Sequence, residues 1–249
     1  FLLADSHFRV DATPVVVVHR ALVANDATAL AQVGQFPIGL QPDFQRVELH
    51  WLKVWRNGQA SDKLQEATVR FYHSERGAEQ GLYTGSVTAV VITPDLRPGD
   101  VLEVIYSLVG QNPVFAGRYV DGASWDTNLP IRWRRVTLDR PAGRPVRHHL
   151  VGAGADGAVV AREHERQGRH LVTFEGRDLP AIDAEALVPP NVHPARWIQF
   201  TEFRDWHEVA GWAADLFRDG GTAELPPLPA TAEPAERTAQ TLAFVQEHI

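Results

Sequence analysis

The stretch RPGDVLEVIYSLVGQNPVFAGR, residues 97–118, decides the fold. Its first four residues have the composition of a tight turn. Pro98 fixes φ, Gly99 supplies a positive φ, and the carboxylate of Asp100 can accept hydrogen bonds from the turn backbone. We therefore predict a structural turn formed by Arg97, Pro98, Gly99 and Asp100.

A β-strand is predicted to follow this turn over residues 101–109. Its odd-numbered and even-numbered side chains are both largely apolar. A strand with two apolar faces is usually covered on both sides, which places this one near the middle of a sheet. Gly110 and the pair Asn112 and Pro113 then end it, because proline has no N–H to donate to a strand ladder.

Outside this stretch, residues 1 to about 200 alternate polar and apolar side chains, with turn signals at short intervals. This pattern is typical of an all-β sandwich. Asn57-Gly58 and Asp156-Gly157 predict two-residue hairpin turns, and Gln167-Gly168 is a weaker signal of the same kind. Residues 61–80 fit either a strand or a short helix. Strands are expected at 6–11, 14–23, 44–56, 85–93, 101–109, 131–139, 145–151, 158–165, 169–176 and 196–203.

The apolar spacing changes to a helical period near residue 201. Asp205 followed by Glu208 predicts the N-cap of an amphipathic helix. A linker rich in Gly and Pro precedes a second helix that begins at Pro234. The predicted fold class is therefore mainly β, an antiparallel β-sandwich over residues 1–200 with a short α-helical C-terminal segment over 201–249.

Composition excludes several classes of function. The formal net charge of −7 argues against general affinity for nucleic acids. The absence of Cys excludes disulfides, thiolate metal sites and a Cys nucleophile. No apolar run approaches the roughly 18 to 20 residues that span a bilayer. Because the chain opens on Phe1 and contains no Met, we expect that a leader or other N-terminal sequence has been removed.

The seven tryptophans could form a platform on which sugar rings stack. Trp51 and Trp55, however, lie at even separation on one predicted strand and share a side with apolar neighbours, so we expect them to be buried. Trp125, in the predicted loop 121–126, is the better candidate for an exposed contact. The arginines of the segment Arg132-Trp133-Arg134-Arg135 are expected to be solvated or paired with carboxylates.

A candidate polar row is predicted in the meander over residues 145–176. With hairpin turns at Asp156-Gly157 and Gln167-Gly168, His149 lies opposite His164, His148 opposite Glu165, and Glu165 opposite His170. Val146, Leu150, Val172 and Phe174 share the face of the row. Two His and one Glu could bind zinc. We favour a hydrogen-bonded ladder of His148, Glu165 and His170, with an ordered contact between the last two, and expect no bound metal or cofactor.

These motifs resemble a bacterial domain of unknown function, number 3857 in that series, which lies N-terminal to transglutaminase-like core domains. The resemblance covers most of residues 1–200. Besides residues 97–118 it rests on QPDFQRVELH (41–50), VWRNG (54–58), GLYTG (81–85), Pro130 and PAGR (141–144).

The resemblance implies a non-catalytic accessory domain, followed by the incomplete helical start of a transglutaminase-like domain. The implied partner is a papain-like Cys-His-Asp core encoded downstream, whose thiolate would attack a Gln or peptide carbonyl and give an acyl-enzyme. The accessory domain would dock on that core or present protein or peptide substrate to it. The resemblance also favours a periplasmic or secreted parent. The alternatives are a stand-alone carbohydrate- or peptide-binding sandwich, and a metal-supported hydrolase site among the histidines.

Overall fold

The computed structural model describes residues 1–74, 84–152, 159–182, 195–218 and 233–248. The chain divides into two compact units, Phe1–Glu202 and Phe203–Ile249. The first unit is built mainly from strands, and the second contains the helices α2 (Trp206–Arg218) and α3 (Pro234–His248). In the part of the chain described, no helix is both long and apolar enough to cross a lipid bilayer.

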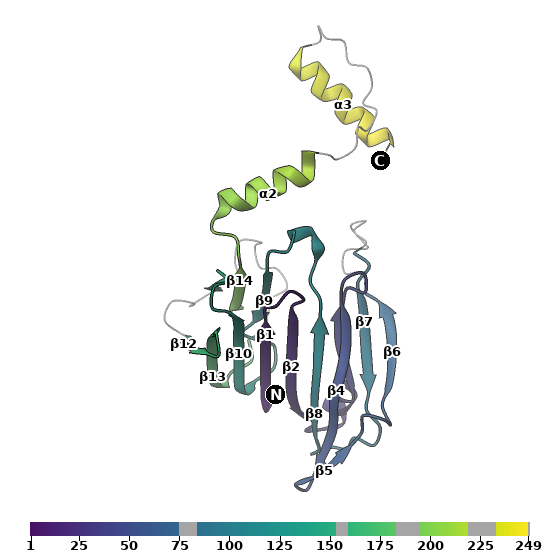
Figure 1. Ribbon diagram of the computed structural model, residues 1–249. Coiled ribbons are helices and arrows are strands. Elements are labelled where there is room, and N and C mark those ends of the chain that lie inside the picture. Colours follow the sequence, from purple (N-terminus) through teal and green to yellow (C-terminus); the bar gives the residue numbers. More distant parts are fainter. Residues whose placement is uncertain (75–83, 153–158, 183–194, 219–232, 249) are drawn as a thin grey trace. The chain divides into compact units, whose positions relative to one another are not determined.

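The first unit contains one large sheet and two small ones (Figure 1). Neighbouring strands in them are antiparallel, except that β1 and β10 are parallel. The eight strands of the large sheet are, in spatial order, β12 (Ala161–Arg166), β13 (Arg169–Leu179), β10 (Ile131–Pro141), β1 (Leu3–Arg9), β2 (Val15–Val23), β8 (Val101–Val109), β4 (Arg46–Arg56) and β5 (Gln59–Asp62). The small sheets have the orders β11 (Arg147–Val151), β14 (Trp197–Thr201), β9 (Val120–Ser124) and β3 (Gln35–Leu40), β7 (Val87–Ile92), β6 (Thr68–His73).

Both small sheets pack on the same face of the large sheet, which we call the inner face; the opposite one is the outer face. The sheet β3-β7-β6 forms a core with side chains of β2, β8 and β4. The sheet β11-β14-β9 forms a second core with side chains of β1, β10 and β13. Val16 of β2 packs against both. The predicted fold class, a mainly β sandwich with a helical C-terminal segment, is confirmed.

Strand β8 lies between β2 and β4, inside the large sheet as predicted. Its even-numbered side chains enter the core, but Val101, Glu103 and Ile105 on the outer face are only half-buried. Further along the same outer face, Ser107 and Val109 are buried. The prediction that β8 is covered on both sides therefore holds only for the end of the strand, since both small sheets lie on the inner face.

The segments that border β8 have the predicted local structure. The backbone N–H of Arg97 donates a 2.8 Å hydrogen bond to the Asp100 carboxylate, and Gly99 has φ +89°. At the other end, Gly110 has φ +114°, and a Cβ there would lie 2.0 Å from the carbonyl oxygen of Phe44. The Asn112 side chain accepts a hydrogen bond from Val114 N–H and caps the short 3₁₀ helix η2 (Pro113–Phe115).

Turn chemistry predicted two hairpins correctly. Asn57 and Gly58 join β4 to β5, with φ of 51° and 78°, and Gln167 and Gly168 join β12 to β13, with φ of 52° and 75°. The pair Asp156-Gly157 lies outside the described residues. Of the ambiguous stretch 61–80, residues 68–73 form strand β6. The elements that were not predicted are α1 (Ala27–Val33), η2, β3 and β9.

The two helices of the second unit begin near their predicted starts. The Asp205 side chain accepts a 2.9 Å hydrogen bond from Glu208 N–H, as an N-cap does. The apolar side of α2 includes Trp206 and Phe217, whose exposed fractions are 84% and 83%. Among the large hydrophobic side chains described in this unit, these two are the most exposed.

Candidate functional site

A β-bulge in β4 determines which tryptophans reach solvent. The register of β4 against β8 shifts between Leu49 and Trp51. Val47 and Leu49 face the core before the shift, and Leu52 and Val54 face it afterwards. Since one extra residue reverses the alternation, Trp51 and Trp55 lie on the outer face, where they are 37% and 38% exposed. The prediction that they are buried on the side of Val47 and Leu49 was wrong.

Trp125 was also assigned to the wrong environment. It is 1% exposed and is a member of the second core. The predicted loop 121–126 is mostly strand β9, which pairs with β14. Beyond that strand, the backbone N–H of Trp125 donates to the carbonyl of Arg196, and the Arg196 guanidinium donates to Asp126 at 2.9 and 2.7 Å. These hydrogen bonds hold the residues that follow β9 against the segment before β14, and the Trp125 indole points into the core.

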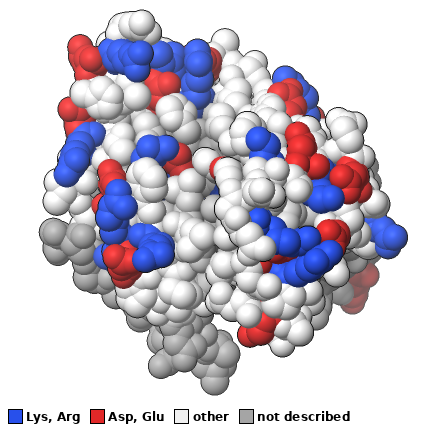
Figure 2. All heavy atoms as spheres, turned by 90° about the horizontal axis from the view of Figure 1, so that it is seen from below, with Lys and Arg blue, Asp and Glu red and all other residues white. Residues whose placement is uncertain are grey.

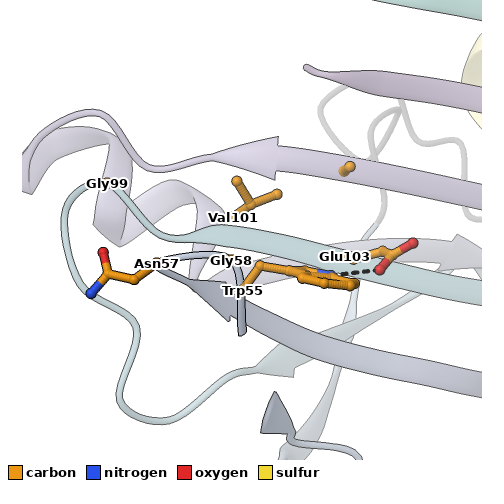
Figure 3. A pocket seen from close by; sticks show the side chains of 7 residues that line it. Trp55, Asn57, Gly58, Gly99, Val101 and Glu103 are labelled. Carbon is orange, nitrogen blue, oxygen red and sulfur yellow. Dashed lines mark hydrogen bonds between the residues drawn. The ribbon is translucent and has the colours of Figure 1, made fainter. Parts of the chain in front are cut away.

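The outer face carries a shallow hollow where β4 ends and β8 begins (Figure 3). The Trp55 indole N–H donates a 2.7 Å hydrogen bond to Glu103 Oε2, and His19 Nε2 lies 2.8 Å from Glu103 Oε1. In Figure 3 the Trp55 ring lies beside the Glu103 carboxylate. The hollow has a volume of about 480 Å³ and is lined by Ala21, Trp55, Asn57, Gly58, Gly99, Val101 and Glu103.

The turn before β8 forms one wall of this hollow. Arg56 of β4 donates to both carboxylate oxygens of Asp100, at 3.0 and 2.7 Å, and also to the Asp95 carbonyl at 2.7 Å. The Arg56 hydrogen bond is the main reason that the pKa of Asp100 lies below its usual value, and burial opposes it. The network joins β4 to the turn. The residues of that turn therefore have a structural role at this part of the outer face.

A second aromatic group lies further across the outer face. The Trp133 ring has the Arg177 guanidinium 4.8 Å and the Arg135 guanidinium 5.4 Å from its centroid, and its N–H donates to Glu175 at 2.9 Å. Arg135 also pairs with Asp5, as expected for this segment. Arg134 departs from that expectation, because it is buried and its hydrogen bonds go to backbone carbonyls and to a serine hydroxyl.

Acidic and basic side chains are interspersed on the face of the molecule shown in Figure 2. Many basic residues of the outer face have acidic neighbours, as Arg46 has Glu48 and Arg9 has Asp11. A polyanion needs a continuous positive field, which the face in Figure 2 does not present. That nucleic acid is not a partner stays a prediction.

The candidate polar row is formed only in part. Glu165 lies opposite His170, as predicted, with 3.7 Å between Glu165 Oε1 and His170 Nδ1. His148, however, lies opposite Phe200, and His149 opposite Gln199, because β11 pairs with β14 in a small sheet. The predicted pairings of His148 with Glu165 and of His149 with His164 were therefore wrong.

The packing of the small sheet on the large sheet nevertheless brings β11, which carries His148, close to β13, which carries His170. The His148 ring contacts that of Phe174, with centroids 5.3 Å apart, and burial lowers the pKa of His148. His170 has a nearer partner than the predicted one, since its Nε2 lies 2.9 Å from Glu163 Oε2. The described residues include no group of three or more His, Cys, Asp or Glu side chains that could hold a metal ion.

The fold defines the class of protein: a two-layer β-sandwich domain with two helices after it. Its sequence belongs to a family of domains of unknown function, DUF3857, whose sequence model matches residues 11–183. No curated protein sequence matches the chain.

The structure is similar to the crystal structure of a "putative protease" from Parabacteroides distasonis, with a TM-score of 0.72 at 16% sequence identity. The match covers 99% of this chain and 50% of the other, so the chain spans half the length of that protein. At this identity the likeness establishes a shared fold.

Proposed function

We propose that the chain is the N-terminal accessory part of a longer, periplasmic or secreted protein with a transglutaminase-like core that uses a Cys-His-Asp site. In this proposal residues 1–202 are not catalytic. They dock on that core or present protein or peptide substrate to it. The observation that carries the proposal is that nearly the whole chain matches only half of a larger protein, the Parabacteroides protein named as a protease.

Two properties of the chain support this division of labour. It contains no Cys, so an acyl-enzyme of the papain type would need a nucleophile from another segment. Its helix α2 carries exposed aromatic side chains at Trp206 and Phe217. We propose that these helices are the start of the core, whose remaining helices would cover these rings.

The test compares the full-length parent with a version that lacks residues 1–202. We expect the shortened protein to retain turnover of a small activated ester and to lose at least tenfold in kcat/KM for a protein substrate. A parent without a Cys-containing core, or a shortened protein with undiminished kcat/KM for the protein substrate, would contradict the proposal. Circular dichroism of the shortened protein shows whether its core is folded.

A second candidate function is binding of a carbohydrate or peptide by the sandwich alone. The observation in its favour is the hollow on the outer face, where the exposed Trp55 ring lies beside the hydrogen-bonding carboxylate of Glu103. Aromatic rings next to acceptors are common in such sites, because the ring contacts apolar ligand surface and the acceptor orients hydroxyl or amide groups.

Tryptophan fluorescence during titration with chitotriose, maltotriose and a neutral tripeptide tests this alternative. Binding in the hollow predicts a spectral change that the Trp55→Phe variant loses and the Trp206→Phe variant keeps. Trp206 is a suitable control because it is exposed and belongs to the other unit. An unchanged spectrum with all three probes would reject the second candidate.

A further inference from the structure

The inner face of the large sheet contains two arginines in one cross-strand row. Ala4 of β1 lies opposite Arg20 of β2 on one side and opposite Arg134 of β10 on the other. Adjacent strands are about 4.8 Å apart, so the two arginine backbones are roughly 10 Å apart with a methyl group between them. The short side chain of Ala4 leaves room between the guanidinium groups.

This row lies in a cleft on the inner face, bordered by β9 of one small sheet. The cleft has a volume of about 310 Å³, and its lining includes Ser6, Arg20, Asp121, Ser124 and Arg134. Val16, which packs against both cores, lies at the same cleft. The cleft is therefore placed where the two small sheets leave the large sheet partly uncovered.

The two guanidinium groups are satisfied only by neutral oxygens. Arg134 donates to the carbonyls of Ala4 at 2.8 Å and Ser124 at 2.7 Å, and Arg20 donates to the carbonyl of Asp5. The hydroxyl of Ser6 accepts from both arginines, at 3.1 and 3.4 Å. Among the described residues, no carboxylate forms an ion pair with either arginine.

Burial makes this arrangement costly. Arg134 is 3% exposed, and its Nε–H has no partner among the described residues. Burial, and then the charge of Arg20, lower the pKa of Arg134 to about 9. The charge of Asp5 opposes these two causes only in part, and the Asp5 carboxylate is itself paired with Arg135. Two like charges withdrawn from water without an ion pair of their own destabilise a fold, and an anion between them would relieve both effects.

We propose that this cleft binds a small organic monoanion through its carboxylate. Arg20, which is half-buried and lines the cleft, makes the direct contact, and Arg134 lies behind it as a second charge. The inference stands on the cleft alone and is independent of the proposed accessory role.

The charge balance and the partial burial of the cleft favour a carboxylate over a phosphate dianion. Asp121 keeps an exposed edge, but burial raises the pKa of its carboxyl to about 6, so it is mostly ionised at neutral pH. Its negative charge reduces the attraction of the cleft for any anion. The cost of desolvating an ion rises with the square of its charge, whereas the attraction by the cleft rises only linearly, so a monoanion is favoured.

The test is a titration of the whole 249-residue chain, followed by NMR or calorimetry, at pH 7.5 and low salt. The probes are an acetylated dialanine with a free C-terminal carboxylate, the same peptide with a C-terminal amide, and inorganic phosphate. We expect the free carboxylate to bind and the amide not to bind. Equal binding of acid and amide, tighter binding of phosphate than of the acid, or no binding of the acid at millimolar concentrations would overturn the proposal.

Three variants locate the binding. Arg20→Gln should weaken binding of the acid at least about tenfold, as expected for a lost charge-assisted hydrogen bond. Arg9→Gln, which removes an arginine from the outer face, should leave the affinity unchanged. Asp121→Asn should strengthen binding roughly threefold, since it removes a like charge from the cleft.

The tighter binding expected for Asp121→Asn is an effect that a folding defect would not produce. A variant Arg20→Gln that binds as tightly as the wild type would overturn the assignment. So would weaker binding by Asp121→Asn, or an equal loss in Arg9→Gln.

Discussion

The Arg56 guanidinium donates two hydrogen bonds, of 3.0 and 2.7 Å, to the Asp100 carboxylate and so connects strand β4 to the turn that precedes β8. The same carboxylate accepts the backbone N–H of Arg97 at 2.8 Å. Asp100 therefore connects the turn over residues 97–100, which borders the hollow on the outer face, to strand β4.

Replacement of Asp100 by Ala should lower the free energy of unfolding by about 2 to 3 kcal/mol. The change removes three hydrogen bonds to a carboxylate that is itself buried, and it leaves the Arg97 N–H without that acceptor. Urea denaturation measures the effect. Asp95→Ala is the control, because Asp95 is exposed at the same network and its loss should cost less. Equal losses in the two variants would show that burial of Asp100 does not matter.

Acidification should remove part of this stabilisation. The pKa of Asp100 is lower in the folded chain than its reference value of 3.8, chiefly because Arg56 donates to the carboxylate. A carboxyl group of this kind stabilises the fold above the unfolded pKa, and the contribution is lost as the pH falls through the folded pKa. The stability difference between wild type and Asp100→Asn should thus be constant near neutral pH and shrink below about pH 4. A difference that grows on acidification would contradict the direction of the shift.

Gly110→Ala should destabilise the sandwich by at least about 3 kcal/mol. Gly110 has a positive φ, and an added Cβ would lie 2.0 Å from the Phe44 carbonyl oxygen, so backbone must move. Gly58→Ala is a matched control, since Gly58 also has a positive φ but a Cβ there meets open space. That variant should lose only about 1 kcal/mol. Comparable losses of stability in both variants would show that the close approach of Gly110 to the Phe44 carbonyl is not the cause.

Much of the sandwich could be predicted from local patterns, but the layer that a segment joins could not. Strand β11 alternates like its neighbours, yet it pairs with β14, which is distant in sequence, and this non-local choice separates His148 from Glu165. The bulge between Leu49 and Trp51 left no turn residue as a signal, and it reversed the faces of both tryptophans. Strand β3 carries Pro37 and Gly39, which argue against a strand, although its alternation is regular and both lie on the exposed side.

The charged site of the inner face could not be predicted either. Arg20 and Arg134 are 114 positions apart in sequence, and they share a row only because β1 pairs with both β2 and β10. The parallel pairing of β1 with β10 has no hairpin signal. By contrast, Arg97, Pro98, Gly99 and Asp100 form a contiguous turn, whose conformation follows from their own backbone preferences.

Helix α3 should exchange its amide hydrogens faster than strand β8. The strand is held by neighbours on both sides and its even-numbered side chains are in the core. Most of the described side chains of α3 are exposed, and a helix of this length with little tertiary cover is marginal in water. Native-state hydrogen exchange, resolved by peptide, compares residues 234–248 with residues 101–109. Equal protection would show that the helix is an integral part of the folded chain.

If the proposed function is right, the 249-residue chain performs no acyl chemistry of its own. The most direct measurement is an assay of the purified 249-residue chain with a dansylated amine and a Gln donor protein, together with peptide hydrolysis. We expect no product above the rate without protein, both before and after treatment with a thiol-blocking reagent. Turnover that follows the amount of folded chain and survives thiol blocking would contradict it, because the chemistry would then lie within residues 1–249.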